Sequence, residues 1–126
     1  MLKSIREFLG KKDIDIPQFI SYDSIWREII ERKLKENIYP GGYVDFDVSP
    51  RKGRKALITY HANPKKFYRY FTQLYRIAKK NNKEYIFLTA WNEWGEGAYL
   101  EPDKRYRNSY LKAIKKVIIR NKGENE

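Results

Sequence analysis

The sequence contains no cysteine and only one histidine, His61. Without cysteine, the chain has no disulfide bonds, no thiolate ligands for zinc and no cysteine nucleophile. His61 has no cluster of acidic residues near it in the sequence, so it makes a poor metal site. We expect it to lie in a loop or to pack against other side chains. The sequence therefore predicts neither a metal centre nor a cofactor.

A long apolar run is also missing. The first 17 residues alternate charged residues with short apolar pieces, unlike a secretory signal peptide or a membrane span. From this pattern we expect no membrane span and a cytoplasmic location.

Acidic residues are absent from one long stretch of the chain. Between Val48 and Lys83 the sequence has eleven lysine or arginine residues and no aspartate or glutamate, within a chain of net charge +11. Our interpretation is that these basic residues lie on solvent-exposed faces of helices. The alternative is a basic module that binds a polyanion. A nucleic-acid partner is not expected, because no motif with base-reading residues is present. The phosphate contacts of that module would be Arg51, Lys52, Arg54, Lys55, Lys65, Lys66 and Arg69.

Size and composition favour a single globular unit. The chain has 126 residues, 41% of them hydrophobic and 16% aromatic, which is enough apolar material to bury a core. A complete (β/α) barrel typically needs about 250 residues. The chain is therefore too short to form such a barrel by itself.

Hydrophobic periodicity predicts three helices. Apolar residues recur at helical spacing over residues 22–35, 64–80 and 106–119. The second helix has the clearest start, because Asn63 is a favourable cap and Pro64 suits the first helical turn.

Strands are predicted between these helices. Alternating residues predict a strand over 43–48, and residues 56–60 form a short extended piece. The apolar run 85–90 is typical of a buried parallel strand, which we expect to be central. Helices that alternate with strands predict an α/β protein, with parallel strands joined by crossover helices.

Two glutamates follow the last predicted strand. Glu93 and Glu96 come directly after residues 85–90, where α/β enzymes place catalytic groups. Two carboxyl groups in one site can divide the roles of acid and base, because repulsion and unequal burial separate their pKa values. Glycosidases use such pairs, about 5–5.5 Å apart in retaining enzymes and roughly 6.5–9.5 Å apart in inverting ones.

Tryptophans and glycines are interleaved with these glutamates. Trp91 and Trp94 offer apolar rings that suit the faces of sugars, while Gly95 and Gly97 permit a sharp backbone path. The competing interpretation is that the tryptophans pack in the core and the glutamates face solvent. The cluster alone leaves both interpretations open.

The run FLTAWNEWGEGAYLEPD, residues 87–103, closely resembles the signature of WbsX-like proteins. These bacterial polysaccharide-biosynthesis proteins are classified as glycosyltransferases and are related to glycoside hydrolase family 99, the endo-α-mannosidases and endo-α-mannanases. Residues 39–41 resemble the family's Pro-Gly turn, residues 46–51 its Trp-Asp-Asn-Thr-Pro-Arg loop, and residues 106–114 its closing helix. The resemblance covers about residues 22–119.

This resemblance implies the C-terminal part of a (β/α)8 TIM-type barrel, with retaining chemistry on α-mannose-like linkages of a polysaccharide. It implies that Glu93 is the base that activates the sugar's own 2-hydroxyl and that Glu96 is the acid/base for the departing oxygen. That mechanism needs no metal. The same matching implies that Asp47 and Arg51 line the sugar site. The supporting residues would be Trp91, Asn92, Trp94, Tyr99 and Glu101.

The sequence departs from the family pattern at three positions. Phe46 stands where the family usually has tryptophan, Val48 where it has asparagine, and Arg107 where glycine is common. All three departures leave both glutamates in place. They bear instead on the loop that carries Asp47 and Arg51.

Residues 22–120 are therefore predicted to form the C-terminal portion of a barrel domain. Residues 1–21 would lead into it and residues 121–126 would form a polar tail. A partial barrel leaves strand edges unpaired. Such a chain could be a piece of an enzyme that associates with another chain to complete the barrel, or a non-catalytic remnant.

Overall fold

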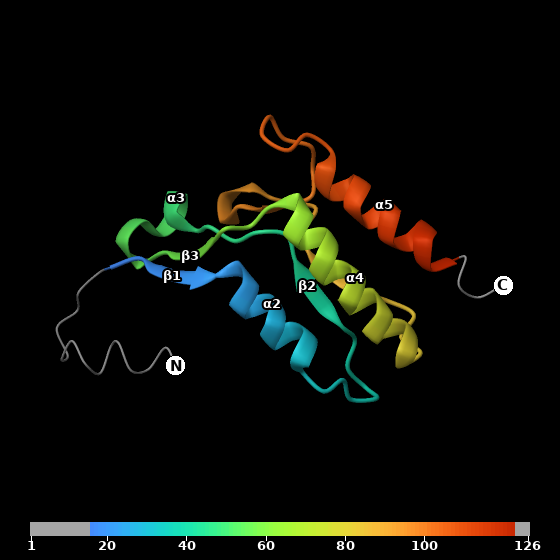
Figure 1. Ribbon diagram of the computed structural model, residues 1–126. Helices are drawn as coiled ribbons and strands as arrows, with labels where there is room; N and C mark the ends of the chain where they lie inside the picture. Colours follow the sequence, from blue (N-terminus) through green and yellow to red (C-terminus); the bar gives the residue numbers. More distant parts are fainter. Residues whose placement is uncertain (1–15, 123–126) are drawn as a thin grey trace.

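The computed structural model describes residues 16–122, in which short strands alternate with helices (Figure 1). Three longer helices dominate this part of the chain: α2 (Tyr22–Glu31), α4 (Pro64–Lys80) and α5 (Ser109–Lys122). The remaining elements are short, namely helix α3 (Ser49–Lys52), the 3-10 turns η1 (Gly53–Lys55) and η2 (Trp94–Glu96), and the strands β1 (Gln18–Ser21), β2 (Gly41–Tyr43), β3 (Leu57–Tyr60), β4 (Phe87–Thr89), β5 (Asn92–Glu93) and β6 (Ala98–Tyr99).

The strands form three pairs. β1 runs parallel to β3, β2 runs parallel to β4, and β5 runs antiparallel to β6. The chain passes from β2 to β4 through α4, which lies between α2 and α5 (Figure 1). Parallel pairs joined through helices confirm the predicted α/β class. No helix within residues 16–122 has both the length and the apolar composition needed to cross a bilayer.

Helix α4 begins where the sequence predicts. The side chain of Asn63 accepts a hydrogen bond from the backbone amide of Lys66 at 3.0 Å, and Pro64 occupies the first turn. This cap satisfies an amide that the first turn leaves without a helical partner. The apolar face predicted for this helix is buried, and its buried members are Phe67, Tyr70, Phe71, Leu74 and Ala78.

An aromatic cluster forms the centre of the core. Trp26 is fully buried and stacks on Tyr70 with ring centroids 5.6 Å apart and on Tyr43 with centroids 5.8 Å apart. Tyr22, also fully buried, meets Trp26 edge to face at 6.2 Å. Stacked and edge-to-face pairs are the preferred arrangements of aromatic rings. This cluster joins α2, β2 and α4 into one unit.

Strand β2 lies earlier than predicted. The prediction of a strand over 43–48 is wrong, because the strand is Gly41–Tyr43. A β-carbon at Gly42 would lie 2.5 Å from Cη2 of Trp26, so the absence of a side chain lets this backbone approach the core. After Tyr43, the Asp45 carboxylate accepts the Phe46 amide at 2.8 Å. The same amide also donates to the Thr59 hydroxyl at 3.1 Å, so both of its partners are side chains and not the backbone of a strand.

Strand β4 is neither fully buried nor central. It covers Phe87–Thr89 instead of residues 85–90, and Phe87 is 63% exposed. Leu88 packs against the core, while the neighbouring side chains point to the opposite face, as strand geometry requires. Within residues 16–122 only β2 pairs with β4. One face and one edge of this strand are consequently uncovered.

Two helices differ from their predicted bounds. Helix α2 ends at Glu31 instead of residue 35, and Leu34 lies outside the core cluster that holds Ile30. Helix α5 begins at Ser109 instead of residue 106, and Arg107 has a φ of 51°, which is not helical. The extended piece predicted at 56–60 is confirmed as β3. Strand β1 was not predicted.

A polar cluster ties α2 to α4. Asp23 accepts hydrogen bonds from the Tyr70 hydroxyl at 2.6 Å and from Arg69 at 3.1 Å, and it also pairs with Lys66. The hydrogen bonds from Lys66 and Tyr70 hold the pKa of Asp23 below its ordinary value of 3.8. The ionised carboxylate is therefore favoured in the folded chain.

We predict that Gly42→Ala destabilises the chain and that Gly41→Ala does not. The new methyl group at position 42 would collide with Trp26, whereas at position 41 its nearest neighbour is the Phe87 carbonyl oxygen at 3.7 Å. Forcing a methyl group into a packed core costs about 1–3 kcal/mol. Thermal unfolding of the two variants measures the difference. Equal melting temperatures would contradict the tight contact at Trp26.

We predict that Asp23→Asn lowers stability by about 1 kcal/mol at pH 7, since partly exposed ion pairs contribute modestly. The folded-state pKa of Asp23 is lowered, so its contribution is present above the ordinary pKa and is lost as pH falls through the folded value. The gap in melting temperature between the native chain and the variant should therefore narrow below about pH 4. A gap that is the same at pH 3 and pH 7 would argue against this electrostatic origin.

Candidate active site

The residues that follow β4 form a small hairpin. Strand β5 pairs with β6, with Asn92 opposite Tyr99 and Glu93 opposite Ala98. The turn η2 joins the two strands and ends at Gly97, whose φ of 62° is in the left-handed region that favours glycine. The predicted catalytic segment is therefore a defined hairpin, beginning three residues after the end of β4.

This hairpin is docked on the segment that follows β2. The Asp47 amide donates a hydrogen bond of 2.7 Å to the Glu96 carbonyl oxygen. A β-carbon at Gly97 would lie 3.0 Å from the Asp47 nitrogen, and one at Gly95 would lie 3.1 Å from Cδ of Arg51. Both glycines thus permit close contact between two segments that are far apart in the sequence.

An ion pair completes this contact. Nη1 of Arg51 donates to Oε1 of Glu96 at 2.9 Å, and the side chain of Glu96 is 33% exposed. The Arg51 side chain is more open to solvent, at 60%. Three of the predicted site residues, Asp47, Arg51 and Glu96, are therefore brought together from α3, the loop before it and the hairpin.

The hairpin also carries an aromatic pair. The rings of Trp94 and Tyr99 stack with their centroids 3.8 Å apart. The indole nitrogen of Trp94 donates to Oε2 of Glu101 at 2.6 Å, and the Tyr99 hydroxyl donates to Oδ2 of Asp103 at 3.1 Å. Each ring is thus held in place by a hydrogen bond to its own carboxylate. Trp94 is 47% exposed, so it remains available to a ligand.

The other predicted site residues are open to solvent. Glu93 and Asn92 are exposed, and Trp91 is 54% exposed. Asn92 contributes its backbone to the hairpin, and the Trp91 carbonyl oxygen accepts the amides of Leu100 and Glu101. The interpretation that Trp91 and Trp94 pack in the core is wrong, because both are exposed, whereas Trp26 is fully buried.

Asp45 is a polar residue at this site that was not predicted. Its Oδ1 accepts hydrogen bonds from the Phe46 amide and from the hydroxyl of Thr59, each at 2.8 Å. Burial raises the pKa of Asp45 above its ordinary value. The alternation of Asp45 with Asp47 is the available signal in the sequence, but the same alternation fits the regular strand predicted over residues 43–48. This half-buried acid borders the segment on which the hairpin is docked.

The seven basic residues of the alternative polyanion module are divided. Arg51 pairs with Glu96, while Lys66 and Arg69 pair with Asp23. These three cations are thus already engaged with carboxylates.

His61 lies in the bend before α4, where its ring meets Tyr60 edge to face at 5.0 Å. Among residues 16–122, no group of three His, Asp or Glu side chains is arranged to hold a metal ion.

Comparisons with known proteins agree on one family. The family described as Glycosyltransferase WbsX matches residues 3–114 of the chain. Two curated relatives, each called uncharacterized protein WxcX, come from Xanthomonas campestris pv. campestris strains B100 and ATCC 33913. Each is 35% identical over 103 residues, which cover 75% of this chain and 15% of the relative. No solved structure matches the chain.

The chain therefore spans about 15% of the length of the curated relatives it matches. The family match includes α3, the hairpin and the start of α5, and so it contains every residue of the candidate site. On the breadth of this match, the chain belongs to the glycosyltransferase WbsX family.

Proposed function

We propose that the chain is a carbohydrate-active enzyme segment that acts on a polysaccharide by glycosyl transfer or hydrolysis, in cell-surface polysaccharide biosynthesis. The observation that carries this proposal is the Glu96 carboxylate held 2.9 Å from Arg51, in the hairpin that also presents the stacked Trp94 and Tyr99 rings. A fixed carboxylate beside an exposed aromatic face is suited to a sugar with a reacting glycosidic oxygen.

The proposed chemistry uses both glutamates on α-mannose-like linkages. Glu93 would remove the proton of the sugar's 2-hydroxyl as that oxygen bonds to the anomeric carbon. Glu96 would protonate the departing oxygen as its bond to the same carbon breaks. Glu93 is exposed and, within residues 16–122, its side chain has no hydrogen bond or ion pair, so it is free to accept a ligand hydroxyl. Glu96 is oriented by Arg51. Water or a second sugar would then bond to the anomeric carbon and give its proton to Glu96, while the 2-oxygen leaves that carbon and recovers a proton from Glu93.

We further propose that residues 22–120 are the C-terminal portion of a (β/α)8 barrel. The parallel pair β2 and β4, reached through α4, supports this proposal. So does the uncovered face of β4, where Phe87 is 63% exposed. The missing strands would come from another part of a longer protein or from a second chain. The proposed boundaries at residues 21 and 121 and the cytoplasmic location remain predictions.

We predict that Trp94→Ala weakens the binding of an α-mannose oligosaccharide by about fivefold, because it removes a stacking interaction of about 1 kcal/mol. Titration calorimetry measures the affinity. Phe19→Ala is the matched control, since Phe19 is also exposed, at 61%, but lies on β1. Equal losses in the two variants would place sugar binding elsewhere.

We predict that Glu93→Gln and Glu96→Gln each lower turnover by about 100-fold or more, since a positioned acid or base contributes that much. Release or transfer of a labelled sugar measures turnover, and circular dichroism checks the fold. Glu84→Gln, an exposed residue before β4, is the control. Full turnover in both variants would rule out the glutamate pair. A chain that binds sugar without turning it over would support the non-catalytic remnant instead.

A further inference from the structure

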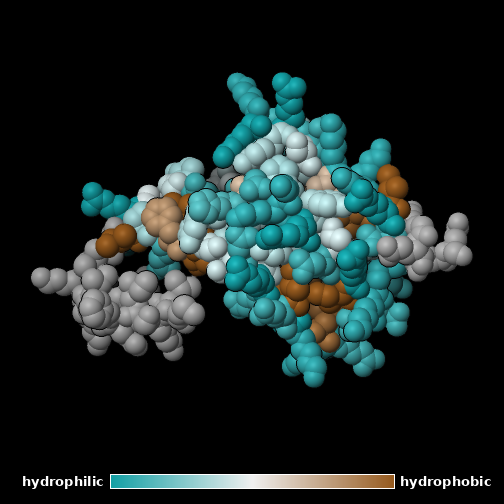
Figure 2. Space-filling model, in the orientation of Figure 1, coloured by the Kyte–Doolittle hydropathy of each residue, from teal (hydrophilic) through white to brown (hydrophobic). Residues whose placement is uncertain are grey.

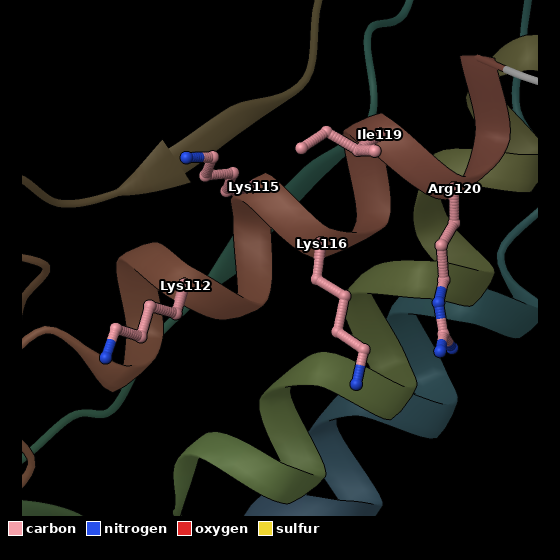
Figure 3. A pocket seen from close by; sticks show the side chains of 5 residues that line it. All are labelled: Lys112, Lys115, Lys116, Ile119 and Arg120. Carbon is pink, nitrogen blue, oxygen red and sulfur yellow. The ribbon is translucent and has the colours of Figure 1, made fainter.

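The outer side of α5 carries a row of cations. Lys112, Lys115, Lys116 and Arg120 line a shallow hollow of about 330 Å³ together with Ile119 (Figure 3). Their spacing of three, four, seven and eight residues places them on one side of a helix. Helix α5 contains no acidic residue, and neither does α4 beside it. We call this set the α5 cationic face.

No carboxylate neutralises this face within the described part of the chain. The contacts of Lys116 and Arg120 are instead with Tyr68 of α4. The Lys116 ammonium lies 5.0 Å from the centre of that ring, and Arg120 donates to its hydroxyl at 3.0 Å. Figure 3 shows both side chains reaching toward α4. Neither contact removes positive charge, so the face keeps its full attraction for anions.

An apolar side chain lies among these cations. Ile119 is 59% exposed, although the opposite side of α5 is buried through Tyr110, Ala113 and Val117. Helix α5 is therefore already fixed to the core. Figure 2 shows a mostly hydrophilic surface on which hydrophobic side chains gather in a few separate areas. An exposed isoleucine on the same side of a helix as four cations is suited to a surface that is anionic and also offers an apolar layer just beneath.

We propose that the α5 cationic face binds the surface of a membrane that contains anionic phospholipids. Their mobile headgroups can gather beneath the four cations, and Ile119 can enter the boundary with the acyl chains. A nucleic acid offers phosphates but no apolar layer for Ile119. This face is separate from the hairpin, so the proposal does not depend on the glutamate pair. It would hold the sugar site close to a bilayer.

Vesicle co-sedimentation of the whole chain tests this proposal. We expect binding to vesicles of phosphatidylcholine with about one-third phosphatidylglycerol, and little binding to phosphatidylcholine alone, because each cation near an anionic surface contributes about fivefold. The triple variant Lys112→Gln, Lys115→Gln, Lys116→Gln should lower the partition coefficient at least about tenfold. Ile119→Ser should lower it about threefold, through lost apolar burial.

A matched triple variant separates this face from net charge. Lys33→Gln, Lys35→Gln, Lys80→Gln removes the same charge from exposed sites outside α5, and we expect it to retain binding within about threefold. Near-UV circular dichroism checks that all variants fold. Equal losses in the two triples would overturn the proposal. So would tighter binding to a mixed-sequence DNA duplex that Ile119→Ser leaves unchanged, because that result would identify a nucleic-acid surface.

Discussion

The indole of Trp26 lies against the backbone of Gly42 with no room for a β-carbon between them. This contact sets how close β2 comes to α2 and α4, because Trp26 also stacks on Tyr70. The position of β2 in turn fixes the segment after it, which carries Asp47 and Arg51. A packing constraint within the core thus determines where one half of the candidate site lies. Close-packed protein interiors transmit strain, so a displacement of Trp26 would be passed on to that segment.

The other half of the site depends on a second close approach. Gly97 brings the hairpin backbone onto Asp47, and the Arg51–Glu96 ion pair forms across the same contact. The site therefore joins two segments that the sequence separates by about 45 residues. Each segment relies on a glycine that permits close contact. The hairpin itself is local, which is why its residues could be assigned together.

Local signals in the sequence predicted the local features well. The Asn63–Pro64 cap, the buried face of α4 and the parallel strand class were all confirmed. Features that depend on distant contacts were not predicted. The pair Gly41–Gly42 has the composition of a turn, and it is a strand because it pairs with β4, far along the chain. Likewise, the run 85–90 has the composition of a buried strand, but its burial depends on neighbours outside its own sequence.

The stacked rings of Trp94 and Tyr99 have a consequence for the thermodynamics of binding. Both side chains are already restrained by hydrogen bonds to Glu101 and Asp103. Their rotational freedom is lost when the chain folds, and not when a ligand arrives. A sugar that lands on this pair would therefore bind with a smaller entropic penalty than on two freely rotating rings. The entropy of ordering these two rings is therefore lost once, on folding, whereas a flexible loop loses it each time a ligand binds.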